Sequence, residues 1–300
     1  MLLIAGTVPT VELPFVSGKV EMQGNNLFVE GYSLPCAQGT TAMVSAALAV
    51  TTYLNLEPPY VVLAGDLGSG EGSRQIYCYL IEHIAELSPR VLALHYIMPD
   101  LELMKKLVAM VDKCQKRPIL IADAGSMYTA KAVGVAPQFD IFTPDPSEIA
   151  FLADPEAIHP AYINKHLFDA DIDRVPELIK KAYEVGGAAK VLLVKGSIDY
   201  IGSDGEIIAT VDQPDVPELE CIGGTGDTIT GMVAALSFAE IDLVSAALIS
   251  ARANRLAGKM AGVSPASRVG ELISLLPRVF RENLCSWCGV CSKEGYHVGG

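Results

Sequence analysis

The sequence predicts an α/β fold: a three-layer α/β/α sandwich with a mostly parallel central sheet. Short β-like apolar runs alternate with stretches of helical periodicity along most of the chain. This alternation is typical of parallel sheets that helices cover on both faces. Hydrophobic residues make up 50% of the 300 positions, which is ample for a buried core. Because neither a repeat nor a linker divides the chain, we expect one domain over residues 1–282 and a cysteine-rich tail over residues 283–300.

The expected elements follow from the apolar runs and from the turn residues that bound them. Strands are expected at residues 2–5, 19–22, 27–29, 60–64, 90–95, 118–122, 139–142, 190–194 and 206–211. Helices are expected at residues 42–54, 76–84, 100–113, 177–185, from 228 onward, 242–261 and 267–282. Residues 155–175 are polar and irregular, so we interpret them as a loop insertion.

The composition argues against several function classes. The formal net charge is −13 and the pI about 4.8, and no run of Lys or Arg occurs, so nucleic acid is not an expected partner. Residues 34–56 carry no charge, but their threonines, with Gln38, Ser45 and Asn55, favour a buried helix over a membrane span. The chain opens without the basic segment of a secretory signal. We expect a cytoplasmic protein that forms a homo-oligomer and binds neither nucleic acid nor membrane.

Residues 223–227 read Gly-Gly-Thr-Gly-Asp and carry the strongest functional signal. Three glycines in four residues are typical of a loop that another group approaches closely. Helical spacing begins at Thr228, so the loop delivers free amides to a helix N-terminus, where anions bind. Asp227 is either the N-cap of that helix or the group that accepts a hydroxyl proton during phosphoryl transfer.

The segment from Gly223 to Gly231 resembles the GTGD signature of the ribokinase superfamily. The longer string GGTGDTITGMVAAL is most similar to the ADP-dependent NAD(P)H-hydrate dehydratase branch of that superfamily. No GK[ST] follows the glycines, so the loop is not a Walker A motif. The resemblance implies ATP or ADP as phosphoryl donor, Mg²⁺, a small-molecule substrate, and Asp227 as the catalytic base. It also implies an anion hole made by Gly224, Thr225 and Gly226.

Other parts of the chain resemble the same family. Lys195 and Gly196 match the KG pair that ends the strand before the nucleotide loop, which implies nucleotide binding. The turn over residues 143–148 resembles the family's metal-binding turn and implies that Asp145 and Glu148 hold Mg²⁺ through water. A solvated turn with a helix cap is the alternative. The predicted substrate residues are Gly39, Thr40 and Asp123. A tight helix start is the alternative for Gly39 and Thr40.

The resemblance covers residues 35–262 and weakens before residue 118. Where the dehydratases carry a glycine-rich turn, residues 95–100 read His-Tyr-Ile-Met-Pro-Asp. His95 stands beside this turn and is either a substrate ligand or a structural histidine. Residues 65–73 form a second glycine-rich loop between a strand and a helix, which indicates either a phosphate turn or a simple connection.

Cys285, Cys288 and Cys291 form a C-x₂-C-x₂-C run that the family resemblance does not cover. Thiolates at this spacing bind zinc or an iron–sulfur cluster. The ferredoxin pattern would need a cysteine at position 295, which is glycine, but His297 could complete a Cys₃His zinc site. Redox-active thiols and cysteines without a ligand are the alternatives.

Three functions remain open at this point. The first is a dehydratase that phosphorylates hydrated NADH or NADPH and eliminates the phosphate. The second is a kinase that releases a phosphorylated sugar or vitamin-like alcohol. The third is a nucleotide- or metal-sensing protein that has kept the fold and lost catalysis.

Overall fold

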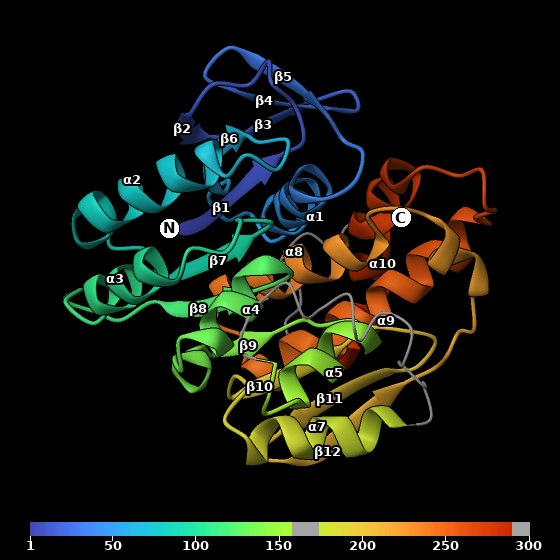
Figure 1. Cartoon of the computed structure of the whole chain (residues 1–300). Helices are drawn as coiled ribbons and strands as arrows, with labels where there is room; N and C mark the ends of the chain where they lie inside the picture. The colour runs from blue at the N-terminus through green and yellow to red at the C-terminus, as the bar shows by residue number, and fades with distance from the viewer. Residues whose placement is uncertain (158–173, 290–300) are drawn as a thin grey trace.

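The computed structural model describes residues 1–157 and 174–289 (Figure 1). Its strands are β1 (Leu2–Val8), β2 (Val16–Lys19), β3 (Glu21–Gln23), β4 (Asn26–Val29), β5 (Tyr32–Pro35), β6 (Tyr60–Gly65), β7 (Val91–His95), β8 (Ile119–Ala122), β9 (Ile141–Phe142), β10 (Val191–Val194), β11 (Asp199–Ser203) and β12 (Glu206–Val211). Its α-helices are α1 (Thr40–Tyr53), α2 (Glu71–Leu87), α3 (Leu101–Val111), α4 (Gly125–Ala132), α5 (Pro146–Ala153), α7 (Val175–Glu184), α8 (Thr225–Phe238), α9 (Leu243–Ala261) and α10 (Val269–Cys288). Short 3₁₀ helices cover Ala136–Gln138 and Pro217–Cys221.

A nine-stranded sheet crosses the middle of the molecule in the order β12-β11-β10-β9-β8-β7-β1-β6-β2. The six strands from β10 to β6 pair in parallel. Strand β2 pairs antiparallel at one edge, and β11 and β12 do so at the other. The predicted α/β fold with a mostly parallel sheet is therefore confirmed.

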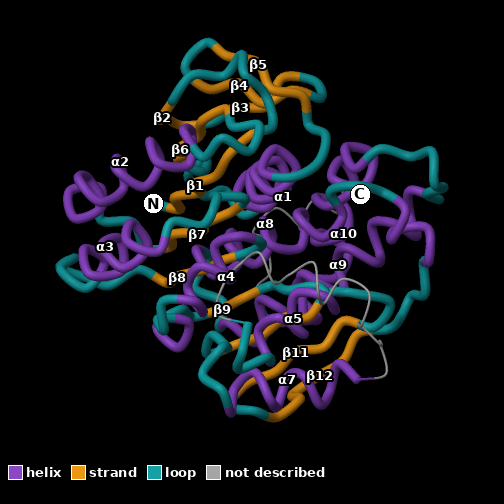
Figure 2. The backbone as a smooth tube through the Cα atoms, viewed as in Figure 1, coloured by secondary structure: helices purple, strands orange, loops and turns teal. Residues whose placement is uncertain are grey.

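Helices cover both faces of the sheet, as Figure 2 shows. Alternate residues of each strand point to opposite faces. In β7, Val91 and Ala93 pack in the core formed with α1, α8, α9 and α10, whereas Leu92 and Leu94 pack in the core formed with α2, α3, α4, α5 and α7. This alternation gives the three layers, and it also decides which helix a residue at the end of a strand will face.

A separate three-stranded sheet, β3-β4-β5, lies near β2 (Figure 1). The single strand expected at residues 19–22 is wrong, because the chain leaves the main sheet after Lys19 and enters the small sheet at Glu21. The uncharged stretch at residues 34–56 contains the buried helix α1, as predicted. Over the described ranges, no helix combines the length and hydropathy that a membrane crossing needs.

Helix α10 runs to Cys288 instead of ending at Glu282. Leu284 is buried against the core, and Trp287 packs beside it, so the last turn of α10 belongs to the folded domain. The division of the chain at residue 282 therefore falls inside a helix. Most of the expected loop insertion at residues 155–175 lies outside the described residues, as do Cys291 and His297.

Candidate active site

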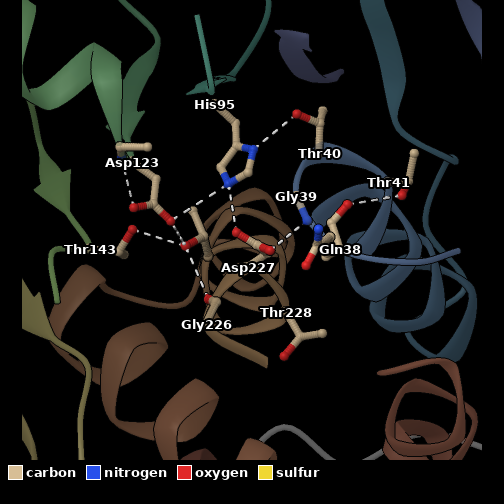
Figure 3. A network of polar contacts seen from close by, with 12 residues as sticks. Gln38, Gly39, Thr40, Thr41, His95, Asp123, Thr143, Gly226, Asp227 and Thr228 are labelled. Carbon is tan, nitrogen blue, oxygen red and sulfur yellow. Dashed lines mark hydrogen bonds and ion pairs between the residues drawn. The ribbon is translucent and has the colours of Figure 1, made fainter. Parts of the chain in front are cut away.

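Four neighbouring parallel strands each place one polar residue at their carboxyl end. His95 is the last residue of β7, while Asp123, Thr143 and Lys195 directly follow β8, β9 and β10. In each case the residue two positions earlier packs in the core on the α8 side of the sheet. Because strand side chains repeat with a period of two, the four polar side chains point toward the first turns of α8. Figure 3 shows three of these residues, His95, Asp123 and Thr143, together with Asp227.

Asp227 lies in the first turn of α8. The N-cap of this helix is Gly224, in the left-handed region with φ 98° and ψ −10°, and no side chain caps it, so the interpretation of Asp227 as the N-cap is wrong. A Cβ on Gly224 would lie 3.0 Å from the carbonyl oxygen of Ala37, which also favours glycine. The Asp227 side chain instead turns toward the sheet, where it meets His95 and α1.

Both carboxylate oxygens of Asp227 accept hydrogen bonds. Oδ2 accepts from the backbone amide of Gly39 at 2.6 Å, and Oδ1 lies 3.0 Å from Nε2 of His95 (Figure 3). Burial acts to raise the pKa of Asp227, but the hydrogen bond and charge of His95, with Lys195 and the Gly39 amide, hold the pKa below its ordinary value. Asp227 is therefore a carboxylate, the form that accepts a proton.

The loop before α8 presents unpaired amides. Within the described residues, the amides of Gly224, Gly226 and Asp227 have no hydrogen-bond acceptor. The Thr225 amide makes a long contact of 3.4 Å to the carbonyl of Ile222, and its hydroxyl donates to backbone carbonyls in the preceding turn. The predicted anion hole is thus available at the two glycines and at Asp227, and less so at Thr225.

Lys195 stands beside this turn. Its ammonium donates to Oδ2 of Asp123 at 2.8 Å, and a Cβ added to Gly226 would lie only 3.6 Å from the ammonium nitrogen. Burial acts to lower the pKa of Lys195, but the carboxylates of Asp123 and Glu148 raise the pKa above its usual range. Lys195 is therefore a fixed cation next to unpaired amides, an arrangement that suits a phosphate.

Asp123 is only 3% exposed. Besides Lys195, it accepts hydrogen bonds from the hydroxyl of Thr230 at 2.6 Å and from the amide of Ala124 at 2.8 Å. The ligand atoms of His95, Asp123 and Asp227 lie within 4.8 Å of one another. Because the Lys195 ammonium already binds Asp123, we assign no metal ion to this group.

Asp145 and Glu148 form the capping box of α5, as the alternative interpretation of this turn predicted. Asp145 accepts the amides of Ser147 and Glu148, while Glu148 accepts the amide of Asp145 and the hydroxyl of Tyr128. Burial, followed by the charges of Asp145 and Asp123, raises the pKa of Glu148 to about 8. The capping role does not remove these residues from the site, because both line its cavity.

The cavity has a volume of about 760 Å³. Its lining includes Asp123, Asp145, Glu148, Lys195, Gly224, Thr225, Gly226 and Asp227. A smaller cavity of about 270 Å³ between α1 and α10 is lined by no Asp, Glu, Lys, Arg or His side chain. The larger cavity can hold a polyphosphate at Lys195 and the α8 turn, with a hydroxyl group beside Asp227.

Comparison with known proteins finds relatives in sequence and in fold, although no family model matches the sequence. The chain is 34% identical over 242 residues to the uncharacterized protein MJ1337 of Methanocaldococcus jannaschii, a match that covers 81% of this chain and 100% of that protein. The solved structure of YxkO from Bacillus subtilis, a member of the UPF0031 family, superposes with a TM-score of 0.57 over 93% of this chain and 92% of that chain. Its sequence identity of 16% means that this likeness concerns the fold. The chain belongs to one family with MJ1337 and has the ribokinase-like fold.

Part of the chain is also similar to NAD(P)H-hydrate repair enzymes. A stretch of 111 residues is 37% identical to the bifunctional NAD(P)H-hydrate repair enzyme Nnr of Pyrobaculum aerophilum. That stretch spans 36% of this chain but 21% of the repair enzyme. Pyridoxal kinase from Entamoeba histolytica has the same fold, with a TM-score of 0.52 and 13% identity over 91% of this chain and 94% of that kinase.

Two predicted substrate residues have internal roles in this site. The Gly39 amide binds Asp227. Thr40 is 1% exposed, and its hydroxyl lies 2.7 Å from the carbonyl of Thr7 and 3.0 Å from Nδ1 of His95. The predicted direct contact between the Thr40 side chain and a substrate is not what this geometry provides. Thr40 holds His95 instead.

Sequence reasoning missed a buried ion pair in the wall of the cavity. Arg255 of α9 donates to Asp199 at 2.8 Å and also binds the carbonyls of Gly196 and Ser197. These bonds fix the turn that follows Lys195. The apolar spacing of α9 gave no reason to single out one arginine, although an arginine on its buried face was a usable signal.

The glycine-rich loop at residues 65–73 has a structural role. The carboxylate of Asp66 accepts the amides of Gly68, Gly70 and Ser73, together with the Ser73 hydroxyl. Burial opposes these bonds, but they hold the pKa of Asp66 below its ordinary value. The Asp66 carboxylate thus occupies the amides that a phosphate would need, so the interpretation of this loop as a phosphate turn is wrong.

Cys285 and Cys288 lie one turn apart at the end of α10. Cys285 is disulfide-bonded, and Sγ of Cys288 lies 3.4 Å from the carbonyl of Leu284. The predicted zinc or iron–sulfur site also needs Cys291, which lies outside the described residues. That site stays a prediction.

Proposed function

We propose that this protein is a nucleotide-dependent phosphoryl-transfer enzyme that uses ATP or ADP with Mg²⁺ to phosphorylate a hydroxyl group on a small molecule. The observation that carries the proposal is the position of the Asp227 carboxylate beside the unpaired amides of α8, in one cavity with Lys195. A proton acceptor next to an anion hole is the arrangement that this reaction needs.

In the reaction, the substrate oxygen forms a bond to the terminal phosphorus of the nucleotide while the bond to the bridging oxygen breaks. The hydroxyl proton passes to Asp227. The amides of Gly224 and Gly226 and the ammonium of Lys195 hold the negative charge on the transferring phosphoryl group. Asp145 and Glu148 offer oxygen ligands at the cavity wall for Mg²⁺, which would neutralise phosphate charge.

We further propose hydrated NADH or NADPH as the substrate. The partial similarity to Nnr enzymes from two organisms supports this choice. Phosphorylation of the ring hydroxyl makes it a leaving group. The phosphate departs with the electrons of the C–O bond, the adjacent carbon loses a proton, and the ring double bond forms again. The products are NADH or NADPH, inorganic phosphate and the shortened nucleotide.

A kinase acting on a small sugar or vitamin-like alcohol is the second candidate. It is favoured by Tyr96, which lines the cavity at the position where the dehydratases have their glycine-rich turn. Tyr96 is 50% exposed, and its ring packs edge-on against His95 at 4.5 Å between centroids. A side chain of this size leaves less room for a dinucleotide than glycine would.

The test incubates the purified chain and Mg²⁺ with ATP or ADP and, in parallel, hydrated NADH, sugars and vitamin-like alcohols. The dehydratase predicts stoichiometric release of phosphate and return of the NADH absorbance, whereas the kinase predicts a phosphorylated alcohol without free phosphate. Asp227→Asn should lower turnover by about 10²–10⁴. Nucleotide binding without turnover of any compound would favour a non-catalytic sensor and contradict the proposal.

Our proposal also includes a cytoplasmic homo-oligomer. Light scattering coupled to size-exclusion chromatography tests the second part, and a mass equal to one chain would contradict it.

A further inference from the structure

His95 is completely buried, and both of its ring nitrogens have partners. Nδ1 lies 3.0 Å from the hydroxyl oxygen of Thr40. That hydroxyl lies 2.7 Å from the carbonyl oxygen of Thr7, which can only accept. The single proton of the Thr40 hydroxyl therefore goes to Thr7, and the proton between Thr40 and His95 must come from Nδ1.

The other nitrogen leads to the same result. Nε2 lies 3.0 Å from Oδ1 of Asp227, and a carboxylate oxygen only accepts. Asp227 is ionised, so the proton in this bond belongs to Nε2. A neutral imidazole carries one N–H, whereas these contacts need two.

We infer that His95 is held as an imidazolium that keeps Asp227 ionised and oriented in the active site, which makes His95 a positioning residue. The protonation state follows from these contacts together with the ionised state of Asp227. The kinetic consequence rests on the proposed phosphoryl transfer by Asp227.

The charges that face His95 are consistent with this state. From α8 comes Asp227, and from the end of β8 comes Asp123, whose Oδ2 lies 3.8 Å from Nε2. Lys195, from the end of β10, binds Asp123 at 2.8 Å, and Thr40 on α1 is uncharged. Two carboxylates, one ammonium and one imidazolium sum to zero. A neutral His95 would leave one uncompensated negative charge in this buried group, which is costly.

A cluster of charged side chains whose charges sum to zero has a functional advantage at this place. The nucleotide brings several negative charges to the adjacent amides of α8 and to Lys195. With His95 protonated, the ionised base does not add a net negative charge to the site. When the substrate hydroxyl transfers its proton to Asp227, the imidazolium keeps both of its own protons.

The first experiment needs no substrate. A long-range ¹H–¹⁵N spectrum of the histidine side chains is recorded near neutral pH, and the His95 signals are assigned by their loss in His95→Gln. We expect both ring nitrogens to show the chemical shift of protonated nitrogen. One unprotonated ring nitrogen at this pH would overturn the inference, whatever the enzyme acts on.

The second experiment measures kcat/KM against pH once a substrate is found. Loss of the cation beside Asp227 should move the acid limb of the profile upward by about one to three pH units in His95→Gln, with little change in nucleotide KM. A folded variant whose acid limb does not move would overturn the positioning role.

Thr40→Val provides a second route if His95→Gln does not fold. It removes the acceptor for Nδ1, so it should give a smaller shift of the acid limb and loss of the second protonated nitrogen. Thr51→Val is the matched control, because Thr51 is also buried on α1 but its hydroxyl binds the carbonyl of Leu48 inside the helix. Equal behaviour of the two threonine variants would contradict the inference. Absence of activity with every compound would count against the proposed function, and the spectrum would still decide the state of His95.

Discussion

Arg255→Met should destabilise the protein and loosen the turn after Lys195. Arg255 and Asp199 are 5% and 3% exposed, and the guanidinium donates to the carboxylate and to two carbonyls of the turn after Lys195. Methionine has a similar length and no donor. The substitution leaves the Asp199 carboxylate buried, with the amide of Gly196 as its remaining hydrogen-bond donor among the described contacts.

Removing one partner of a buried ion pair costs about 3–5 kcal/mol of unfolding free energy. In a chain of this size, each kcal/mol lowers the melting temperature by about 2–4 °C, so the expected drop is about 6–20 °C. Burial raises the pKa of Asp199 even with Arg255 present, and loss of the cation raises the pKa further. A raised carboxyl pKa means that stability falls as pH increases, so the deficit of the variant should grow from pH 5 to pH 8.

The assay is urea unfolding at both pH values, together with calorimetric titration of Mg-ATP. Arg252→Met is the control: Arg252 lies on α9 and is partly exposed, so a change within about 0.5 kcal/mol is expected. Adding Asp199→Asn to Arg255→Met should recover stability, because the unpaired charge is then gone. A loss below about 1 kcal/mol at pH 8, or a loss that shrinks with rising pH, would refute this account of the pair.

Three further predictions follow. Mg-ATP at 100 times its Kd should stabilise the native protein by about 2.7 kcal/mol, seen as a higher melting temperature, and the shift should shrink in Lys195→Met and in Gly226→Val; an equal shift in both variants would exclude this phosphate site. Because the pKa of Glu148 is raised to about 8, its own contribution to the stability of the metal-free protein should be greatest below the ordinary carboxyl pKa and be lost as pH rises to about 8, so wild type should lose more stability than Glu148→Gln over this pH range in urea titrations; an equal loss in both proteins would contradict it. Protein purified anaerobically with reductant should contain zinc, or iron with acid-labile sulfide, near one site per chain, and lose it in Cys288→Ser; metal-free protein would dismiss the predicted cysteine site.

The fold and part of the site could be predicted because they depend on local signals. Apolar periodicity located the parallel strands, and the glycines before Asp227 marked the start of α8. The end of α10 could not be placed, because Leu284 and Trp287 are fixed by contacts with distant helices. Residues 19–22 likewise have the composition of one strand. In the folded protein the chain leaves the main sheet after Lys19 and enters the second sheet at Glu21.

The partners of a polar residue were harder to predict than its position. His95 was visible as the end of a strand, and Asp123 and Lys195 were singled out for the same reason, yet only the strand order places β7 next to β8. Because successive side chains of a strand point to opposite faces, the position of each residue along its strand then decides which helix it faces. Since His95, Asp123 and Lys195 each extend the side of the sheet that faces α8, their charges converge on Asp227 although the four residues span 132 positions of sequence. A sequence pattern can nominate such residues one by one, but whether a histidine is a charged partner or a neutral one depends on all the hydrogen bonds that converge on it.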